Sequence, residues 1–339
     1  MLTLADINAA QQRVAPYVHK TPVLTSHLLN QWLGHNVYFK VESLQKVGAF
    51  KARGACNALA WLKEQEQLPK HIVANSSGNH AQAVAWAAAQ FQIPATIFMP
   101  TNVSKIKAQA TKSYGANVVL CNTRQEADER VADAAEQTGF YWLPPYNHEQ
   151  IICGQGTCAL EALQQQPDID AVFAPCGGGG LLSGTYIATN GIAEQQHKQI
   201  KVIGVEPLIA NDAACSLREN KIMTLSDTPS TLADGAKTLS VGSLTFEYLK
   251  KLDGFYEVEE RAIAYWTQWL NHLLKVRIEP TSAMSMAAAV RWLKTHDAAQ
   301  ASSKPLNLLI IISGGNIDQK TMQTIWQTDY LTTLPQEFS

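Results

Sequence analysis

The stretch LNLLIIISGGN (residues 306–316) contains five consecutive apolar residues and ends in small and polar ones. A run without alternation of polar and apolar residues indicates a strand that is buried on both faces. Such strands are typical of parallel sheets, because the helices that connect parallel strands cover both faces of the sheet. The stretch therefore predicts an α/β protein built on parallel sheets.

The rest of the chain repeats this alternation of short apolar runs and longer helical patterns. Alanine-rich or amphipathic segments separate the apolar runs, as expected for connecting helices. Alternating strands and helices are typical of α/β proteins with parallel sheets. We expect further strands at residues 37–42, 71–77, 95–100, 116–122, 171–176 and 201–207, and helices at residues 81–92, 104–115, 124–139 and 181–193.

The composition is that of an ordinary globular protein: 339 residues, 46% hydrophobic, 17% charged, with a formal net charge of −2. No long basic run is present, so we expect neither nucleic acid nor a membrane surface as a partner. No apolar stretch approaches the ~20 residues of a membrane span, and the N-terminal residues lack a signal-peptide pattern. The cysteines lack CxxC spacing, which favours free thiols in the cytoplasm over a zinc site or disulfides. They are Cys56, Cys121, Cys153, Cys158, Cys176 and Cys215.

Small, polar or glycine residues follow four of the expected strands. Ligands of open α/β sheets bind beyond the carboxyl ends of the strands. One such end is an ordinary turn, but four together favour a single polar site lined by backbone groups. The four ends read SSGNH (76–80), GGGG (177–180), EP (206–207) and SGGN (313–316).

The glycine run at 177–180 precedes an expected helix and exposes several backbone N–H groups. Such groups favour a phosphate, although a flexible turn is the plainer alternative. A dinucleotide fingerprint would need a glycine where Leu182 stands, and a Walker loop would need a lysine where Leu181 stands. A phosphate monoester fits better. Pyridoxal phosphate carries one phosphate and requires a lysine, which directs attention to Lys51 in GAFKARG (48–54).

Eight motifs appear in an order that resembles the fold type II pyridoxal-phosphate enzymes, in the branch of serine/threonine dehydratases and serine racemases. The resemblance extends from about Thr21 to Asp318. It implies a tryptophan synthase beta-like α/β fold with two domains, each with a mostly parallel sheet flanked by helices. The expected large, cofactor-binding domain comprises residues 1–67 and 149–339, and a small domain of residues 68–148 closes over the active site. The motifs are QKVGAFKARGACNAL, SSGNHAQA, GQGTCALE, CGGGGLLSG, GVEP, LADGAK, IEPTSA and SGGN.

The resemblance implies that Lys51 forms a Schiff base with pyridoxal phosphate and later acts as the base at the substrate Cα. A lysine can do so when desolvation or a nearby positive dipole lowers its pKa, and an ordinary solvated lysine is the alternative. Ser313 would face the pyridine nitrogen, where a hydroxyl makes the ring a milder electron sink than a carboxylate would, which suits β-elimination. The other implied cofactor-binding residues are Phe50, Asn79, Gly177, Gly178, Gly179 and Gly180.

Substrate contacts are implied by the same resemblance. The loop around SSGNH would hold the substrate carboxylate near a helix N-terminus, where negative charge is favoured. Ser77 would lie on the substrate face opposite Lys51 and exchange a proton with Cα from that side. His80 is alternatively an ordinary residue of a first helical turn. The implied substrate-binding residues are Ser76, Ser77, Asn79, His80 and Gly235.

The segment EPLIAND (206–212) resembles the divalent cation site of the family. The resemblance implies carboxylate ligands from Glu206 and Asp212 and a carbonyl ligand from Ala210. Oxygen ligands of this kind suit Mg²⁺ or Ca²⁺. Two solvated acids at the end of a strand are the alternative.

Three motifs depart from the family pattern. Ala49 stands where serine is usual, Cys158 stands where isoleucine is usual, and EPTSA (279–283) replaces EPTAG. These small changes near the expected site bear on substrate preference more than on cofactor use.

The resemblance and the site chemistry predict a dehydratase that converts L-serine, L-threonine or 3-hydroxyaspartate to a 2-oxo acid and ammonia. A serine racemase with Lys51 and Ser77 as its two bases is the alternative. A β-replacement synthase is disfavoured, because that branch typically has TSGNTG where this chain has SSGNHA. The intact Lys51 argues against a non-catalytic ligand binder, and the missing fingerprint argues against a NAD-dependent oxidoreductase. A homodimer is expected from the resemblance.

Overall fold

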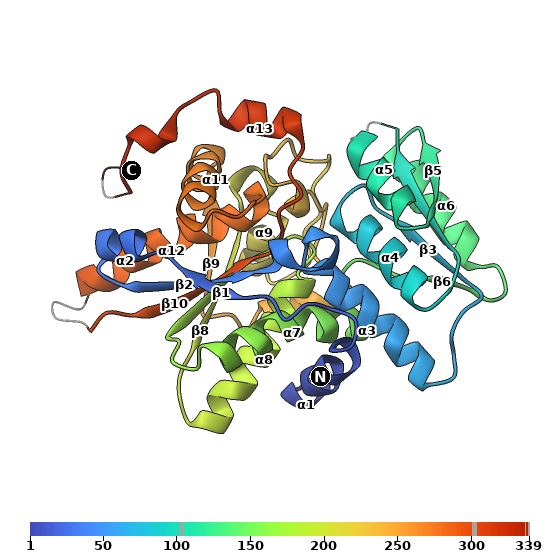
Figure 1. Ribbon diagram of the computed structural model, residues 1–339, viewed down its shortest axis with the longest axis horizontal. Helices are drawn as coiled ribbons and strands as arrows, with labels where there is room; N and C mark the ends of the chain where they lie inside the picture. Colours follow the sequence, from blue (N-terminus) through green and yellow to red (C-terminus); the bar gives the residue numbers. More distant parts are fainter. Residues whose placement is uncertain (102, 104, 300–303, 336, 338–339) are drawn as a thin grey trace.

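The protein consists of two β-sheets with helices on their faces (Figure 1). The structure is a computed structural model that describes residues 1–101, 103, 105–299, 304–335 and 337. The larger sheet has the strand order β1-β2-β10-β7-β8-β9, and the smaller sheet has the order β5-β4-β3-β6. Among the described strands, all neighbours are parallel except β1 and β2. The predicted α/β class is therefore confirmed. The strands are β1 (Val23–Thr25), β2 (Asn36–Val41), β3 (His71–Asn75), β4 (Ala95–Pro100), β5 (Asn117–Cys121), β6 (Phe140–Trp142), β7 (Ala171–Pro175), β8 (Lys201–Pro207), β9 (Gly254–Val258) and β10 (Asn307–Ile312).

Strand β10 contains the unbroken apolar run of residues 308–312, and it lies between β2 and β7 in the middle of the larger sheet. Helices cover both faces of this sheet, so the apolar run has no solvent-facing side. Each of its five apolar side chains is fully buried, at 0% exposure: Leu308, Leu309, Ile310, Ile311 and Ile312.

The expected strands and helices are confirmed to within a few residues at their ends. The helix expected at 104–115 is observed as α5, from Lys105, and residue 104 lies outside the described residues. Three strands were missed: β1, β6 and β9. Two of them are only three residues long, and β9 is a partly exposed strand at the edge of its sheet. Such segments carry little periodic signal.

Helices pack on the larger sheet in two groups. One face carries α1, α7, α8 and α10, and the other carries α2, α11 and α12. None of the helices that the structure describes is long and apolar enough to cross a membrane. The helices are α1 (Leu4–Val14), α2 (His27–Leu33), α3 (Lys51–Glu64), α4 (Asn79–Gln90), α5 (Lys105–Ser113), α6 (Arg124–Ala135), α7 (Glu149–Gln165), α8 (Gly180–Gln196), α9 (Asp212–Glu219), α10 (Ser243–Leu249), α11 (Glu260–Leu274), α12 (Pro280–Ala299) and α13 (Gln319–Ile325).

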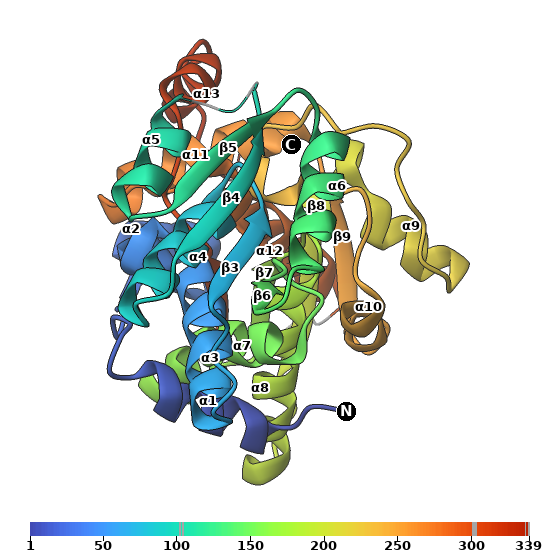
Figure 2. The ribbon, with the colours of Figure 1, turned by 90° about the vertical axis from the view of Figure 1, so that its right-hand side faces the viewer.

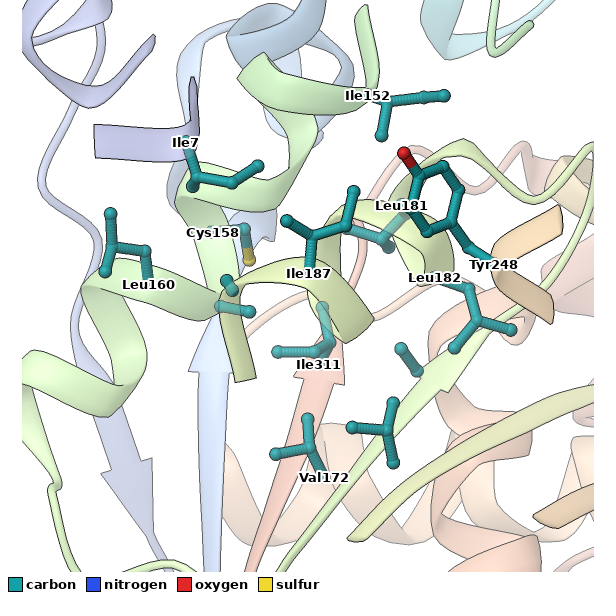
Figure 3. Packing of buried hydrophobic residues seen from close by; sticks show 14 of the residues in the cluster. Ile7, Ile152, Cys158, Leu160, Val172, Leu181, Leu182, Ile187, Tyr248 and Ile311 are labelled. Atoms are coloured by element: carbon teal, nitrogen blue, oxygen red, sulfur yellow. The ribbon is translucent and has the colours of Figure 1, made fainter. Parts of the chain in front are cut away.

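The core on one face of the larger sheet is built from side chains of α1, α7 and α8 that meet the strands (Figure 3). Leu182 and Ile187 of α8 belong to the same cluster as Val172 of β7 and Ile311 of β10. Full burial of one such aliphatic side chain stabilises the fold by about 1.5–3 kcal/mol. This packing fixes the start of α8, and with it the glycine run, relative to the strand ends.

The smaller sheet is formed by residues 71–142, with α4 against one face and α6 against the other (Figure 2). Helix α3 belongs to the apolar cluster of α4 and also packs closely on α7. A Cβ at Gly154 of α7 would lie 2.5 Å from the carbonyl oxygen of Arg53 and 2.8 Å from Cα of Gly54. Helix α3, which begins at Lys51, thus lies against elements of both sheets.

Candidate active site

A cavity of about 1590 Å³ lies where the carboxyl ends of strands from both sheets face each other. Its lining includes Lys51 and the segments that follow β3, β7 and β10. All residues assigned from the sequence to cofactor and substrate line this one cavity, although their roles remain predictions. They are Phe50, Lys51, Ser76, Ser77, Asn79, His80, Gly177, Gly178, Gly179, Gly180, Gly235 and Ser313.

Lys51 is the first residue of α3, and its amine points into the cavity wall rather than to open solvent. Its Nζ donates a hydrogen bond to the carbonyl oxygen of Pro145 at 2.6 Å and lies 5.1 Å from the ring centroid of Phe50. Burial lowers the pKa of Lys51 to about 7. A large share of this amine is therefore unprotonated near neutral pH, which is the form that attacks a carbonyl or accepts a proton.

The SGGN segment after β10 holds the turn that leads to Lys51. The backbone N–H of Phe50 donates to the carbonyl of Ser313 at 2.9 Å, and the side chain of Asn316 donates to the carbonyl of Val47 at 2.7 Å. Val47 has a left-handed φ of 55° and Gly48 has one of 69°. Residues far apart in the chain thus fix the position of the lysine.

Asn79 is held at both ends of its amide. Its Nδ2 donates to the carboxylate oxygens of Glu279 at 3.0 and 3.2 Å, and its Oδ1 accepts from Asn316 Nδ2 at 2.9 Å. Burial raises the pKa of Glu279 to about 7, against the hydrogen bond from Asn79, which lowers it. Glu279 belongs to the motif IEPTSA, from which no role for it is predicted. A lone carboxylate gives no signal of its own, since such residues are usually solvated.

His80 lies in the first turn of α4 and is buried. Its Nε2 is 2.9 Å from the carbonyl oxygen of Leu143, which makes Nε2 the protonated nitrogen. Burial and the nearby Lys51 lower the pKa of His80 to about 3, so the ring is neutral under ordinary conditions. Ser76 accepts a hydrogen bond from the backbone of Gly78, and Ser77 lines the cavity beside it.

The glycine run forms a cradle with no room for side chains. A Cβ at Gly177 would lie 2.5 Å from the carbonyl oxygen of Gly235, and one at Gly178 would collide with the ring of Tyr146. Gly179 has φ of +90° and precedes α8, whose N-terminus faces this loop. Backbone N–H groups that line the cavity at the start of a 17-residue helix suit a phosphate group. The residues present therefore fit the phosphate and the aldehyde of pyridoxal phosphate.

An ion pair that the sequence does not predict lies in the lining of the cavity. Lys107 of α5 pairs with Asp234, the neighbour of Gly235. On the same side, Arg124 of α6 donates to the carbonyl of Lys237 at 2.9 Å. These contacts join helices of the smaller sheet to loops of the larger one. No sequence pattern marks them, because the partners are more than 100 residues apart.

The residues of the expected cation site lie outside the cavity lining. Glu206 and Asp212 are both buried, at 1% exposure, and Glu206 accepts hydrogen bonds from the backbone of Ala213 and Ala214. Oδ2 of Asp212 has no partner among the described residues. Burial raises the pKa of both carboxyls, that of Asp212 to about 7. The described residues hold no cluster of three or more His, Cys, Asp or Glu side chains suited to a metal, and the expected site has only two.

Helix α3 also contributes to a network of four charged side chains that are fully or nearly buried. Arg53, two residues after Lys51, donates to Glu42 at 2.7 Å and to Glu161 at 3.1 Å, and Glu161 also accepts from Lys40 at 2.5 Å. Burial alone would raise the pKa of Glu42, but Arg53 lowers it below its usual value. Two cations and two carboxylates balance each other and tie α3 to β2 and α7. No motif or spacing in the chain predicts this network.

A lysine amine of lowered pKa beside a phosphate cradle, between two largely parallel sheets, defines an enzyme that carries pyridoxal phosphate. The family model described as "Pyridoxal-phosphate dependent enzyme" matches residues 14–314. The chain belongs to this family, as the motifs predicted.

Three known proteins show how far the similarity extends. L-threo-3-hydroxyaspartate ammonia-lyase of Saccharomyces cerevisiae is 40% identical over 325 residues, which are 95% of this chain and 96% of that protein. Serine racemase of Dictyostelium discoideum is 41% identical over 327 residues, which are 96% of this chain and 98% of that protein. The crystal structure of the T.th. threonine deaminase superposes with a TM-score of 0.84 at 39% identity, over 94% of this chain and 99% of that one. The fold expected from the fold type II resemblance is thereby confirmed.

Proposed function

We propose that the protein removes water from a β-hydroxy amino acid and releases a 2-oxo acid and ammonia. The observation that carries this proposal is the Lys51 amine, with a pKa of about 7, in one cavity with the glycine cradle and Ser313. L-Serine, L-threonine and 3-hydroxyaspartate are the candidate substrates. The ammonia-lyase and threonine deaminase among the similar proteins support this class of reaction.

Bound pyridoxal phosphate would supply a conjugated ring that accepts negative charge from the substrate Cα. Lys51 would hold its aldehyde, the run at 177–180 its phosphate, and Phe50 and Asn79 its ring and 3'-oxygen. Once its amine is free, Lys51 would accept the proton from Cα, and the hydroxyl would leave Cβ as water after taking up one proton, so that the elimination balances. The resulting enamine hydrolyses to the 2-oxo acid and ammonia.

The loop from Ser76 to His80 would orient the substrate by its carboxylate. Backbone N–H groups at the start of α4 and the hydroxyls of Ser76 and Ser77 offer donors there. His80 is neutral, so it would contribute a dipole and not a positive charge. Its bond to Leu143 positions the ring against the neighbouring loop.

The direct test is a steady-state assay of 2-oxo acid formation with L-serine, L-threonine and the isomers of 3-hydroxyaspartate. We expect turnover with at least one of them and release of one ammonia per 2-oxo acid. A protein that carries pyridoxal phosphate but turns over none of these substrates would refute the elimination.

We expect kcat to rise as the pH increases through about 7 and to level off above it. The unprotonated amine of Lys51 is the active base, and it predominates above its pKa of about 7. Glu279 has a pKa near the same value, so the profile is measured in parallel on Glu279→Gln. If the rise of kcat with pH persists in Glu279→Gln, it is caused by deprotonation of Lys51. If the rise is lost in that variant, it is caused by Glu279.

Racemisation of serine is the second candidate function, favoured by the position of Ser77 in the cavity and by the similar serine racemases. Ser77 and Lys51 would exchange protons with Cα from opposite faces. We expect Ser77→Ala to lose racemisation by at least about 100-fold and to keep elimination within a few-fold. Chiral chromatography and the 2-oxo acid assay on the same sample measure both. Equal loss of the two activities would contradict a two-base site.

We infer that Glu206, Asp212 and the carbonyl of Ala210 hold a divalent cation, Mg²⁺ or Ca²⁺. The support is a pair of buried carboxylates, of which one oxygen lacks a partner among the described residues. We expect millimolar Mg²⁺ or Ca²⁺ to raise the Tm by several degrees, because a ligand that binds only the folded state stabilises it. Glu206→Gln should lose this increase, and Glu219→Gln, at the exposed far end of α9, should keep it. An equal increase in both variants would place the ion elsewhere.

We further propose that residues 68–148 form a small domain that closes over the cavity, against a large domain of residues 1–67 and 149–339. Separate sheets in these two parts and the contacts of Lys107 and Arg124 with loops of the other part support this division. A cytoplasmic homodimer is proposed from the resemblance. The six free cysteines are consistent with the reducing compartment.

A further inference from the structure

Ser282, the third residue of α12, contacts Ser313, which is the residue expected to face the cofactor ring. Its Oγ lies 3.0 Å from Oγ of Ser313, 3.0 Å from the backbone nitrogen of Gly314 and 3.0 Å from the carbonyl oxygen of Gly314. Ser282 is at 0% exposure and Ser313 at 1%. Ser313 lines the cavity and Ser282 does not, so the direct side-chain contact of Ser282 with the site is the one with Ser313.

The hydroxyl of Ser313 is bonded to another neutral group and not to a charged one. Within the described part of the chain, its one hydrogen-bond partner is Ser282. An unprotonated pyridine nitrogen is purely an acceptor, and the hydroxyl proton of Ser313 is the donor available to it. When Ser313 donates toward the cavity, its oxygen has lone pairs left for a donor from behind.

Counting protons shows that Ser282 is able to be that donor. A serine hydroxyl has one proton, and Ser282 already uses a lone pair to accept from the N–H of Gly314. Its proton can go to the carbonyl of Gly314 or to Ser313. That carbonyl already accepts from the N–H of Glu279 at 3.1 Å, so it is satisfied without Ser282. Donation to Ser313 produces a chain of two hydroxyls, in which each bond polarises and strengthens the next.

We propose that Ser282 is a positioning residue that orients the Ser313 hydroxyl and strengthens its hydrogen bond to the ring nitrogen of pyridoxal phosphate. This inference rests on the proposed function and on the expected placement of Ser313. The relay withdraws more electron density from the ring than Ser313 alone, without placing a full charge on the nitrogen. The pattern EPTAG has alanine at this position, so the relay is a feature of this chain and not of the motif.

The test compares Ser282→Ala with Ser285→Ala, which removes an equally buried hydroxyl one turn later on α12. Oγ of Ser285 has no partner among the described residues, so its loss leaves the site untouched. We expect Ser282→Ala to lower kcat about fivefold with KM nearly unchanged, as for loss of one hydrogen bond. The pH at which the visible band of bound cofactor titrates should move upward, because a less electron-poor ring makes the Schiff-base nitrogen more basic. Ser285→Ala should match the wild type in both.

A double variant separates this role from a structural one. In the Ser313→Ala background, Ser282→Ala should have no further effect on kcat or on the band, because the hydroxyl that it orients is gone. An effect that persists there, or a Ser282→Ala variant that behaves like Ser285→Ala, overturns the proposal. A wild-type protein without a cofactor band would instead refute the proposed function, so the two failures are distinguishable.

Discussion

Lys51→Ala is expected to lower turnover by at least about 10⁴-fold and to abolish covalent attachment of pyridoxal phosphate. The variant loses both the amine that binds the aldehyde and the base that removes the Cα proton. The glycine cradle remains, so weak binding of free cofactor is expected to persist. Absorption spectra of the wild type and the variant, before and after borohydride reduction and denaturation, distinguish attached from free cofactor.

Lys46→Ala is the matched control, since it removes a lysine five residues away that does not line the cavity. It should keep the visible band and activity within about twofold. Attachment that survives in Lys51→Ala, or is lost in Lys46→Ala, would place the reactive amine elsewhere. Circular dichroism of the two variants checks that each is folded.

Arg53→Met is expected to lower the free energy of unfolding by about 3–5 kcal/mol at neutral pH. The substitution removes the ion pair of Glu42 with Arg53 and leaves that carboxylate in the interior with only Thr21 as a hydrogen-bond donor among the described residues, and a buried charge that loses its ion-pair partner is costly. Urea denaturation of the apoprotein measures the loss. Lys198→Met, which breaks an exposed pair with Asp168, should cost at most about 1 kcal/mol.

The size of this loss should depend on pH. Arg53 lowers the pKa of Glu42 below its usual value of 4.5, so the pair stabilises the fold above that pH and loses its contribution as the pH falls further. In Arg53→Met the carboxyl can take up a proton, and the difference from the wild type should narrow in acid. A loss that is the same at pH 7.5 and pH 5 would indicate that missing packing, and not the unpaired charge, causes it.

The parts of the fold that the sequence predicts are those with a local signal. The unbroken apolar run of β10 indicates burial on both faces, and the glycines at 177–180 indicate a phosphate site. The rest depends on contacts between distant segments. Glu279 becomes part of the site only because Asn79 and Asn316 are brought to it, and Lys107 only because α5 lies opposite Asp234.

The same contrast holds for the lysine itself. Its motif identifies Lys51, but the lowered pKa results from burial by segments that precede or follow it by many residues, such as the one containing Pro145. Ser282 is a minor departure from a motif in the sequence, and its contact with Ser313 is visible only in the structure. The effect of substituting one small residue therefore depends on the residues that it contacts in the folded protein.

The central place of β10 has a consequence for biosynthesis. This strand is the last of the sheet to leave the ribosome, yet it lies between β2 and β7, which are made much earlier. Until it emerges, the two halves of the larger sheet have no strand to join them, and the turn before Lys51 lacks its partner Ser313. Such long-range pairing slows folding and leaves unpaired strand edges exposed during synthesis. The nascent chain should therefore depend on chaperones until β10 has been translated.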